Sequence, residues 1–247
     1  MKRYCLYLFI LIGISCSAEL KAQRNGTVYK GNDPAVRYTG RTLVSSDGSV
    51  AFDWVGTYLE TRFTGGRLSV KVSETGTSYY NVFVDGKLHK VVKVCGTDTL
   101  IHLVSGIDKR IHSLKIQKRS EGEFGKTTIH QFVLSGSGRL AEEPAVRTRH
   151  IEFIGNSLTC GYGTDGKHRD EPFLVETENC NLTFASMVAR YYDADYTLIA
   201  HSGRGAARNY GDSVRVSKVT MKDRMLNTFD EDLTHKWNFK EYRPDLV

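Results

Sequence analysis

Leu68-Ser-Val-Lys-Val-Ser73 and Tyr80-Asn-Val-Phe-Val-Asp-Gly86 are the stretches that decide the fold of the first half of this 247-residue chain. In each stretch an apolar residue returns at every second position, which is the pattern of a strand with one buried face. The Asp85-Gly86 pair predicts a hairpin turn, because glycine tolerates the positive φ that such a turn requires. These stretches therefore predict strands joined by tight turns.

More short apolar runs follow at the spacing of hairpins, and we find no helical apolar stripe between residues 42 and 140. The runs cover residues 88–94, 100–104, 111–116 and 129–134. Turn-prone pairs such as Ser105-Gly106 separate them. This half of the chain therefore predicts an all-β sandwich or jelly roll.

The pattern changes after the linker-like segment at residues 135–138. We expect strands at 151–154 and 196–200, a helix near 184–191, a second helix at 221–229, and the opening of a third strand at 244–247. Strands that alternate with helices predict a parallel α/β sheet. Binding sites in such sheets gather beyond the carboxyl ends of the strands.

The first of these helices is predicted by its apolar residues, which recur at i, i+3, i+4 and i+7 and would form one buried face. They are Phe184, Met187, Val188 and Tyr191. Asn181 or Thr183 is the expected capping residue, because short polar side chains accept hydrogen bonds from free N–H groups at a helix start.

The N-terminus predicts export. Lys2 and Arg3 precede an apolar run at residues 4–14, and small and polar residues follow, which is the order of a secretory signal. Cleavage after Ala22 is one interpretation. The other is a bacterial lipoprotein box at residues 13–16, and in that case the protein would reach a membrane through a lipid on Cys16.

Composition and cysteine usage narrow the class further. The formal net charge of +6 is spread along the chain, whereas nucleic-acid binders concentrate their basic residues, so no nucleic-acid partner is expected. Cys160 and Cys180 could form a disulfide or remain thiols, and Cys95 is left over. The His and Cys residues lack the spacing of zinc ligands, so no metal site is expected.

The candidate nucleophile is Ser157. It lies in Ile151-Glu-Phe-Ile-Gly-Asn-Ser-Leu-Thr-Cys-Gly-Tyr-Gly163, directly after a predicted buried strand and on a glycine-flanked turn. This position holds a hydroxyl at the edge of the sheet, where the following turn can direct backbone N–H groups at an oxyanion. The alternative interpretation is a capping serine in a tight turn.

This block resembles the Gly-Asp-Ser-Leu block of the SGNH hydrolase superfamily, with Asn156 in the aspartate position. With a preceding β-sandwich, its extended form is similar to carbohydrate esterase family 2, the acetyl xylan esterases and related deacetylases. A second block, Ala200-His-Ser-Gly-Arg-Gly205, follows the next strand. The resemblance makes Gly203 an oxyanion-hole donor beside Ser157, with Gly205 as the alternative.

The resemblance implies a fold, a domain division and a reaction. The expected parts are a signal peptide at 1–22, a jelly-roll domain at 23–140, a linker at 141–148 and, at 149–247, the first part of a three-layer SGNH-hydrolase domain of flavodoxin-like type. Ser157 would remove acetyl groups from polysaccharides such as xylan or glucomannan through an acyl-enzyme. Serine acyl transfer requires no cofactor.

The family's histidine base and third oxyanion donor would lie beyond Val247, so we expect a truncated product of doubtful activity. His201 is the only candidate substitute by position, and a structural role is the better interpretation of it. The competing hypothesis is a glycan-binding protein without catalysis, or an inactive fragment. Exposed aromatic residues would then bind sugar, and Trp54, Tyr58, Tyr79 and Tyr80 are the candidates.

Overall fold

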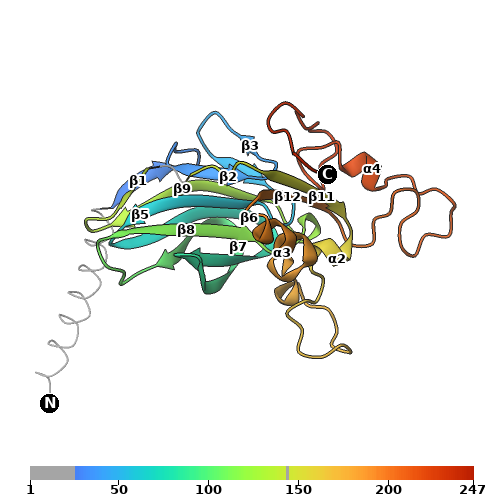
Figure 1. Cartoon of the computed structure of the whole chain (residues 1–247), viewed down its shortest axis with the longest axis horizontal. Coiled ribbons are helices and arrows are strands. Elements are labelled where there is room, and N and C mark those ends of the chain that lie inside the picture. The colour runs from blue at the N-terminus through green and yellow to red at the C-terminus, as the bar shows by residue number, and fades with distance from the viewer. Residues whose placement is uncertain (1–25, 143–144) are drawn as a thin grey trace, which may run out of the picture.

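The computed structural model describes residues 26–142 and 145–247 (Figure 1). The predicted signal peptide and Cys16 lie outside these residues. Within them, no helix combines the length and apolar character needed to cross a membrane. A large β-sheet region fills one end of the molecule, and the chain after residue 149 lies at the other end.

The first region consists of ten strands, which confirms that this half is mostly β. In chain order the strands are β1 (Thr27–Lys30), β2 (Val36–Thr39), β3 (Leu43–Val44), β4 (Val50–Phe52), β5 (Tyr58–Thr64), β6 (Arg67–Val84), β7 (Lys87–Val104), β8 (Ile111–Lys118), β9 (Thr127–Ser135) and β10 (Arg139–Leu140). The short 3₁₀ helix η1 (Gly122–Phe124) joins β8 to β9. All neighbouring strands in this region are antiparallel.

Strand β6 connects the two sides of the sheet. Its first part pairs with β9, its last part pairs with β8, and β7 runs along most of its length. The path β10-β5-β8-β6-β9-β4-β3 thereby wraps around a single apolar core. Phe63, Leu68, Val82, Phe132 and Leu134 are fully buried in that core.

The hairpin at Asp85-Gly86 is confirmed, since β6 and β7 flank it. The prediction of separate strands at 88–94 and 100–104 is wrong, because β7 runs unbroken from residue 87 to 104. Its pairing with β6 instead shifts register around Glu74 and Thr77. Such bulges bend a strand without ending it, and a sequence pattern does not distinguish a bulge from a turn.

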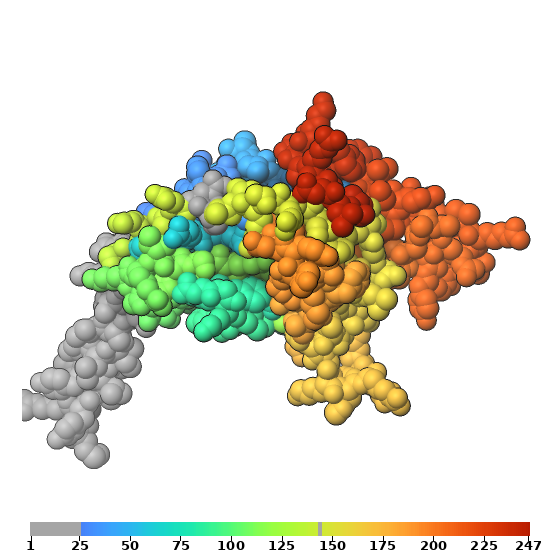
Figure 2. Space-filling view, in the orientation of Figure 1, coloured from blue at the N-terminus to red at the C-terminus, as the bar shows by residue number. Residues whose placement is uncertain are grey.

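The rest of the chain has far less regular structure. Its elements are β11 (His150–Gly155), α2 (Ser157–Cys160), η2 (Val175–Thr177), η3 (Cys180–Leu182), α3 (Phe184–Tyr191), β12 (Asp195–Ala200) and α4 (Met221–Arg224). β11 and β12 pair in parallel, and Leu246 forms a parallel bridge to Ile151. The predicted strands and the parallel start of the third are therefore confirmed. Segments around residues 165–172 and 205–220 project from the body of the molecule, in yellow and orange (Figure 2).

Two helix predictions need correction. The predicted apolar face of α3 lies outward, with Phe184 and Met187 about half exposed and Tyr191 82% exposed. The buried face instead carries Ala185, Ser186 and Ala189, because small side chains allow the helix to approach the sheet closely. The helix expected at 221–229 is only the single turn α4. The chain leaves the helix at Met225, whose carbonyl accepts a hydrogen bond from Arg41 of the β region.

Candidate active site

Ser157 occupies the first turn of α2, directly after the end of β11. Asn156 is the N-cap of this turn, and its Oδ1 accepts a hydrogen bond from the Leu158 N–H at 3.1 Å. Gly155 permits the close approach of Thr159, because a Cβ at Gly155 would lie 2.0 Å from Oγ1 of that residue. Asparagine therefore provides the acceptor that this turn needs.

Gly203 lies on the loop after the neighbouring strand. Gly155 and Ala200 are register partners in the parallel pair, so the two strands end side by side. Gly203 adopts a φ of +72°, a left-handed conformation that favours glycine, and its carbonyl accepts from the Tyr210 N–H at 2.8 Å. The loops that carry Ser157 and Gly203 thus meet at one edge.

Ser157 and Gly203 line a common cavity of about 680 Å³. Gly205, the alternative donor, lines the same cavity. Neither the Ser157 N–H nor the Gly203 N–H donates to another group in the described part of the chain. Free backbone N–H groups in a cavity that also holds a nucleophilic hydroxyl can stabilise a tetrahedral oxyanion by hydrogen bonds.

Aromatic side chains form one wall of this cavity. The rings of Tyr162 and Phe173 stack at 3.6 Å between centroids, and Phe124 lies 5.7 Å from Phe173. Tyr210 adds a ring that is 92% exposed. This aromatic wall could not be predicted from the sequence, because Phe124 follows β8 and approaches the other rings only in the folded chain.

The aromatic residues proposed from the sequence lie elsewhere. Trp54, Tyr58 and Tyr80 are at most 2% exposed and belong to the interior. Tyr79 is partly buried and donates from its hydroxyl to Glu176 at 3.3 Å. None of these four lines the cavity that contains Ser157.

His201 directly precedes the lining residues Ser202 and Gly203, but it does not itself line the cavity. It is 1% exposed, and its Nδ1 lies 2.7 Å from Oδ2 of Asp230. Burial disfavours the charged imidazole, but the hydrogen bond with Asp230 and the charges of Asp230 and Glu121 together outweigh it and raise the pKa of His201 above its ordinary value. A histidine held in this way supports its loop, and no hydrogen bond joins it to Ser157 among the described residues.

Asp230 is in turn held by the β region. Oδ1 of Asp53 accepts from the Asp230 N–H at 2.8 Å, and Oδ2 accepts from the Glu231 N–H at 3.1 Å. Arg224 donates to Oδ1 of Asp230 at 3.0 Å. Burial and the nearby charge of Asp230 raise the pKa of Asp53 to about 7. The base of the Gly203 loop is therefore a buried network of charges shared by both regions.

A second buried pair of carboxyl groups supports the same loop. Glu121 lies between β8 and η1, and its Oε2 accepts from the Ser202 N–H at 2.6 Å, one residue before Gly203. Oε2 of Glu178 accepts from the Glu121 N–H at 3.0 Å. Burial and the adjacent Glu121 raise the pKa of Glu178 to about 9, so this pair holds a proton at neutral pH.

The loop that carries Phe173 is fixed by Arg119. This buried side chain donates from Nε to the Glu178 carbonyl at 2.7 Å and from Nη2 to the Glu176 carbonyl at 2.9 Å. It also forms an ion pair with Asp165. Glu121 and Arg119 were missed from the sequence, because charged residues that follow a strand usually face solvent.

Cys160 and Cys180 do not form the disulfide that the sequence left open. Cys160 and Cys180 are both free and fully buried, and Cys95 is free and exposed. Burial raises the pKa of Cys180 to about 12, which leaves a neutral and unreactive thiol. His168 lies in an exposed loop, as its sequence context indicates.

The chain is similar in sequence to known proteins. Residues 38–144 match the family model described as carbohydrate esterase 2 N-terminal. A cellulase/esterase, CelE, of Acetivibrio thermocellus is 32% identical over 216 residues, which is 87% of this chain and 26% of that protein. An acetylxylan esterase/glucomannan deacetylase of Cellvibrio japonicus is 27% identical over 218 residues, 87% of this chain and 60% of that protein.

Solved structures agree with these matches. A family two carbohydrate esterase from Clostridium thermocellum, in complex with cellohexaose, superposes with a TM-score of 0.80 at 32% identity. The superposition covers 85% of this chain and 64% of that protein. A family two carbohydrate esterase from Cellvibrio japonicus also has a TM-score of 0.80, at 25% identity, with 66% of its length covered by 90% of this chain.

The fold, the family model and these relatives make the chain similar to the carbohydrate esterases. Among these, the similarity is to carbohydrate esterase family 2, whose N-terminal domain is matched by residues 38–144. The chain spans between about a quarter and two thirds of the length of the relatives named above.

Proposed function

We propose that this chain carries the nucleophile and part of the oxyanion hole of a secreted O-acetyl esterase that acts on polysaccharides such as xylan or glucomannan. The observation that carries the proposal is the meeting of Ser157 and Gly203 at one cavity, each on the loop after one of two paired parallel strands. The names of the relatives support this substrate class.

The reaction would be acyl transfer. Oγ of Ser157 attacks the acetyl carbonyl carbon, and the N–H groups of Ser157 and Gly203 donate to the oxyanion that forms. Collapse of the tetrahedral intermediate releases the sugar hydroxyl and leaves an acetyl ester on Ser157, which water then hydrolyses. No cofactor enters this sequence of steps.

A general base must take the proton from Ser157. His201 is already engaged with Asp230 and buried, so we assign it to support of the loop. We propose instead a histidine of an SGNH-type domain whose first part is residues 149–247. In this proposal a signal peptide occupies 1–22, a jelly-roll domain occupies 23–140, and a linker occupies 141–148. Export by that signal would bring the enzyme to its extracellular substrate.

Acetate release by the complete secreted protein tests the proposal. Acetylated xylan and acetylated glucomannan are incubated with the wild-type protein and with Ser157→Ala, and released acetate is measured. We expect the variant to lose at least about a thousandfold in rate, since the nucleophile is absent. Release at the wild-type rate by Ser157→Ala would overturn the assignment of the nucleophile.

Binding without catalysis is the second candidate function, and the aromatic wall of the cavity favours it. Tyr162 and Phe173 offer the apolar ring faces that can pack against sugar rings. A solved relative was crystallised with cellohexaose. Retention on a cellulose or xylan column that Tyr162→Ala abolishes, together with no acetate release by the wild-type protein, would favour this function over the first.

A further inference from the structure

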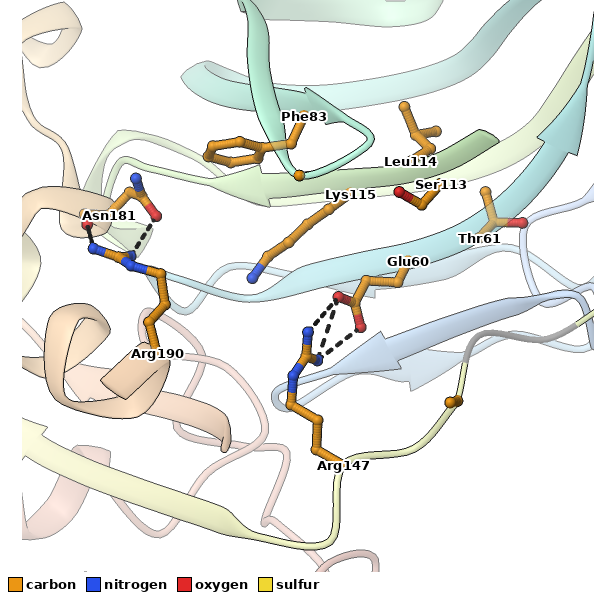
Figure 3. A pocket seen from close by; sticks show the side chains of 11 residues that line it. Glu60, Thr61, Phe83, Ser113, Leu114, Lys115, Arg147, Asn181 and Arg190 are labelled. Carbon is orange, nitrogen blue, oxygen red and sulfur yellow. Dashed lines mark hydrogen bonds and ion pairs between the residues drawn. The ribbon is translucent and has the colours of Figure 1, made fainter. Parts of the chain in front are cut away.

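A second cavity, of about 380 Å³, lies where strands β5 and β8 approach helix α3 and residues 145–147 (Figure 3). It shares no lining residue with the cavity that contains Ser157. Three basic side chains line it, those of Lys115, Arg147 and Arg190, against the single carboxylate of Glu60. The charge of this cavity is therefore unbalanced toward positive.

The carboxylates beside this cavity already have partners. Glu60 forms ion pairs with Arg37 and, at 3.3 Å, with Arg147. Asp195 lies 2.6 Å from Arg37 and 2.8 Å from Arg147, and the Tyr58 hydroxyl donates to it at 2.6 Å. Arg147 also pairs with the exposed Asp193 at 3.3 Å, so both arginines are neutralised by carboxylates.

Two cations remain outside this balance. Nζ of Lys115 forms neither a hydrogen bond nor an ion pair with the described residues, and it lies 3.7 Å from the Tyr58 ring centroid. Arg190 donates only to the side chain and carbonyl of Asn181, which are neutral. Figure 3 shows Lys115 extending between the Glu60–Arg147 pair and the Arg190–Asn181 pair.

The environment of Lys115 favours the binding of an anion that enters the cavity from solvent. Burial lowers the pKa of Lys115 to about 8, although the charge of Glu60 opposes this shift. A partly buried ammonium that lacks a counter-charge is costly, and an anion that entered the cavity would compensate it.

The remaining lining suits a polyhydroxylated molecule. The hydroxyl group of Ser113 and the amide of Asn181 can exchange hydrogen bonds with sugar hydroxyls, and Phe83 provides an apolar ring. We propose that this cavity binds a single sugar unit that carries a carboxylate, a uronic acid, with Lys115 as the principal counter-charge and Arg190 as the second. The site is independent of the esterase function.

Titration calorimetry at pH 7 with D-glucuronate, and with D-glucose as the neutral counterpart, tests this site. We expect glucuronate to bind at least about tenfold more tightly than glucose, because a charged hydrogen bond contributes the difference. Lys115→Met should weaken glucuronate binding at least about tenfold. Lys109→Met, a change at an exposed lysine outside the cavity, should leave it unchanged.

Arg190→Gln is the second variant, because this exposed side chain can change without loss of core packing. It should weaken glucuronate binding about threefold or more, with unchanged near-ultraviolet circular dichroism. Equal binding of glucose and glucuronate, no saturable binding of glucuronate, or undiminished binding by a folded Lys115→Met or Arg190→Gln protein would each overturn the proposal.

Discussion

The strands up to residue 140 and the segment from residue 201 to 247 obtain their order in different ways. The strands surround an apolar core in which Phe63, Leu68 and Phe132 have no exposed surface. The later segment has only the single-turn helix α4 among its regular elements, and the polar groups Arg41, Asp53 and Arg224 hold it in place. The site loops are therefore stabilised by buried charged groups, whereas the β region is stabilised by apolar packing.

The largest expected effect is on the β core. Phe132→Ala should lower the free energy of unfolding by about 3–5 kcal/mol, because it leaves a cavity in a tightly packed interior. Phe184→Ala is the matched control on α3, where the ring is 54% exposed and lies edge-on to Phe153, and should lower the free energy of unfolding by only about 1 kcal/mol. Urea unfolding measures both, and equal effects would contradict the contrast between the two surfaces.

Arg41→Met tests the dependence of the later segment on charge. Arg41 is 1% exposed and donates to the carbonyls of Met225 at 2.6 Å and Asn227 at 2.8 Å. We expect a loss of about 2–4 kcal/mol, since these carbonyls would stay buried without a donor. Hydrogen exchange should accelerate at residues 221–240 more than in β6.

Arg67→Met, at an exposed position on β6, is the control for that variant. It should leave exchange in residues 221–240 unchanged. If Arg41→Met accelerated exchange evenly across β6 and the later segment, the side chain would belong to the stability of the whole fold and not to that segment alone.

The buried carboxyl groups predict a dependence of stability on pH. The pKa values of Glu178, about 9, and Asp53, about 7, lie above those of the unfolded chain. Folding therefore takes up protons, so their contribution is full below the unfolded pKa and is lost as the pH rises toward the folded values. Stability should fall between pH 5 and pH 9, by up to about 1.4 kcal/mol per pH unit for each proton taken up.

Glu178→Gln separates the two contributions. The variant should lose the slope between pH 7 and pH 9. Between pH 5 and pH 7 it should lose about half of the slope and keep the half that comes from Asp53. Glu176→Gln, at an exposed position on the same loop, should retain the wild-type profile. An unchanged slope above pH 7 in Glu178→Gln would show that this carboxyl group is not the one that holds the proton.

The smallest expected effect is at the cap of α2. Asn156→Ala should cost about 1 kcal/mol, because the Leu158 N–H loses its acceptor. Asn156→Asp retains an acceptor at the same position and should stay within about 0.5 kcal/mol of the wild-type protein. Thermal unfolding measures both variants, and a larger loss in the aspartate variant than in the alanine variant would contradict the capping role.

Much of the fold could be predicted because it is encoded by local patterns. Alternating residues gave β6, β8 and β9, and the parallel strands β11 and β12 were found from short apolar runs. The outward face of α3 was not predictable, because periodicity identifies an apolar stripe but not its neighbour. The extent of β7 depended on bulges, which leave no clear signal in the sequence.

In the candidate site, too, only the features with a local sequence pattern could be predicted. Ser157 and Gly203 were predicted because each follows a strand and lies among glycines, which is a local signal, and the structure brings the two residues to one cavity. Glu121 and Asp53 were missed, since their partners Ser202 and Asp230 lie far along the chain. Polar contacts of this kind have no periodicity, so only the folded structure brings them together.

The separation in sequence of these contacts has a consequence for synthesis. Arg41 and Asp53 precede their partners by 186 and 177 residues. Domains that leave the ribosome first can fold before later segments are made. The β region can therefore act as a template that is complete when residues 225–231 emerge, and the loop at Gly203 acquires its shape only after those residues have been made.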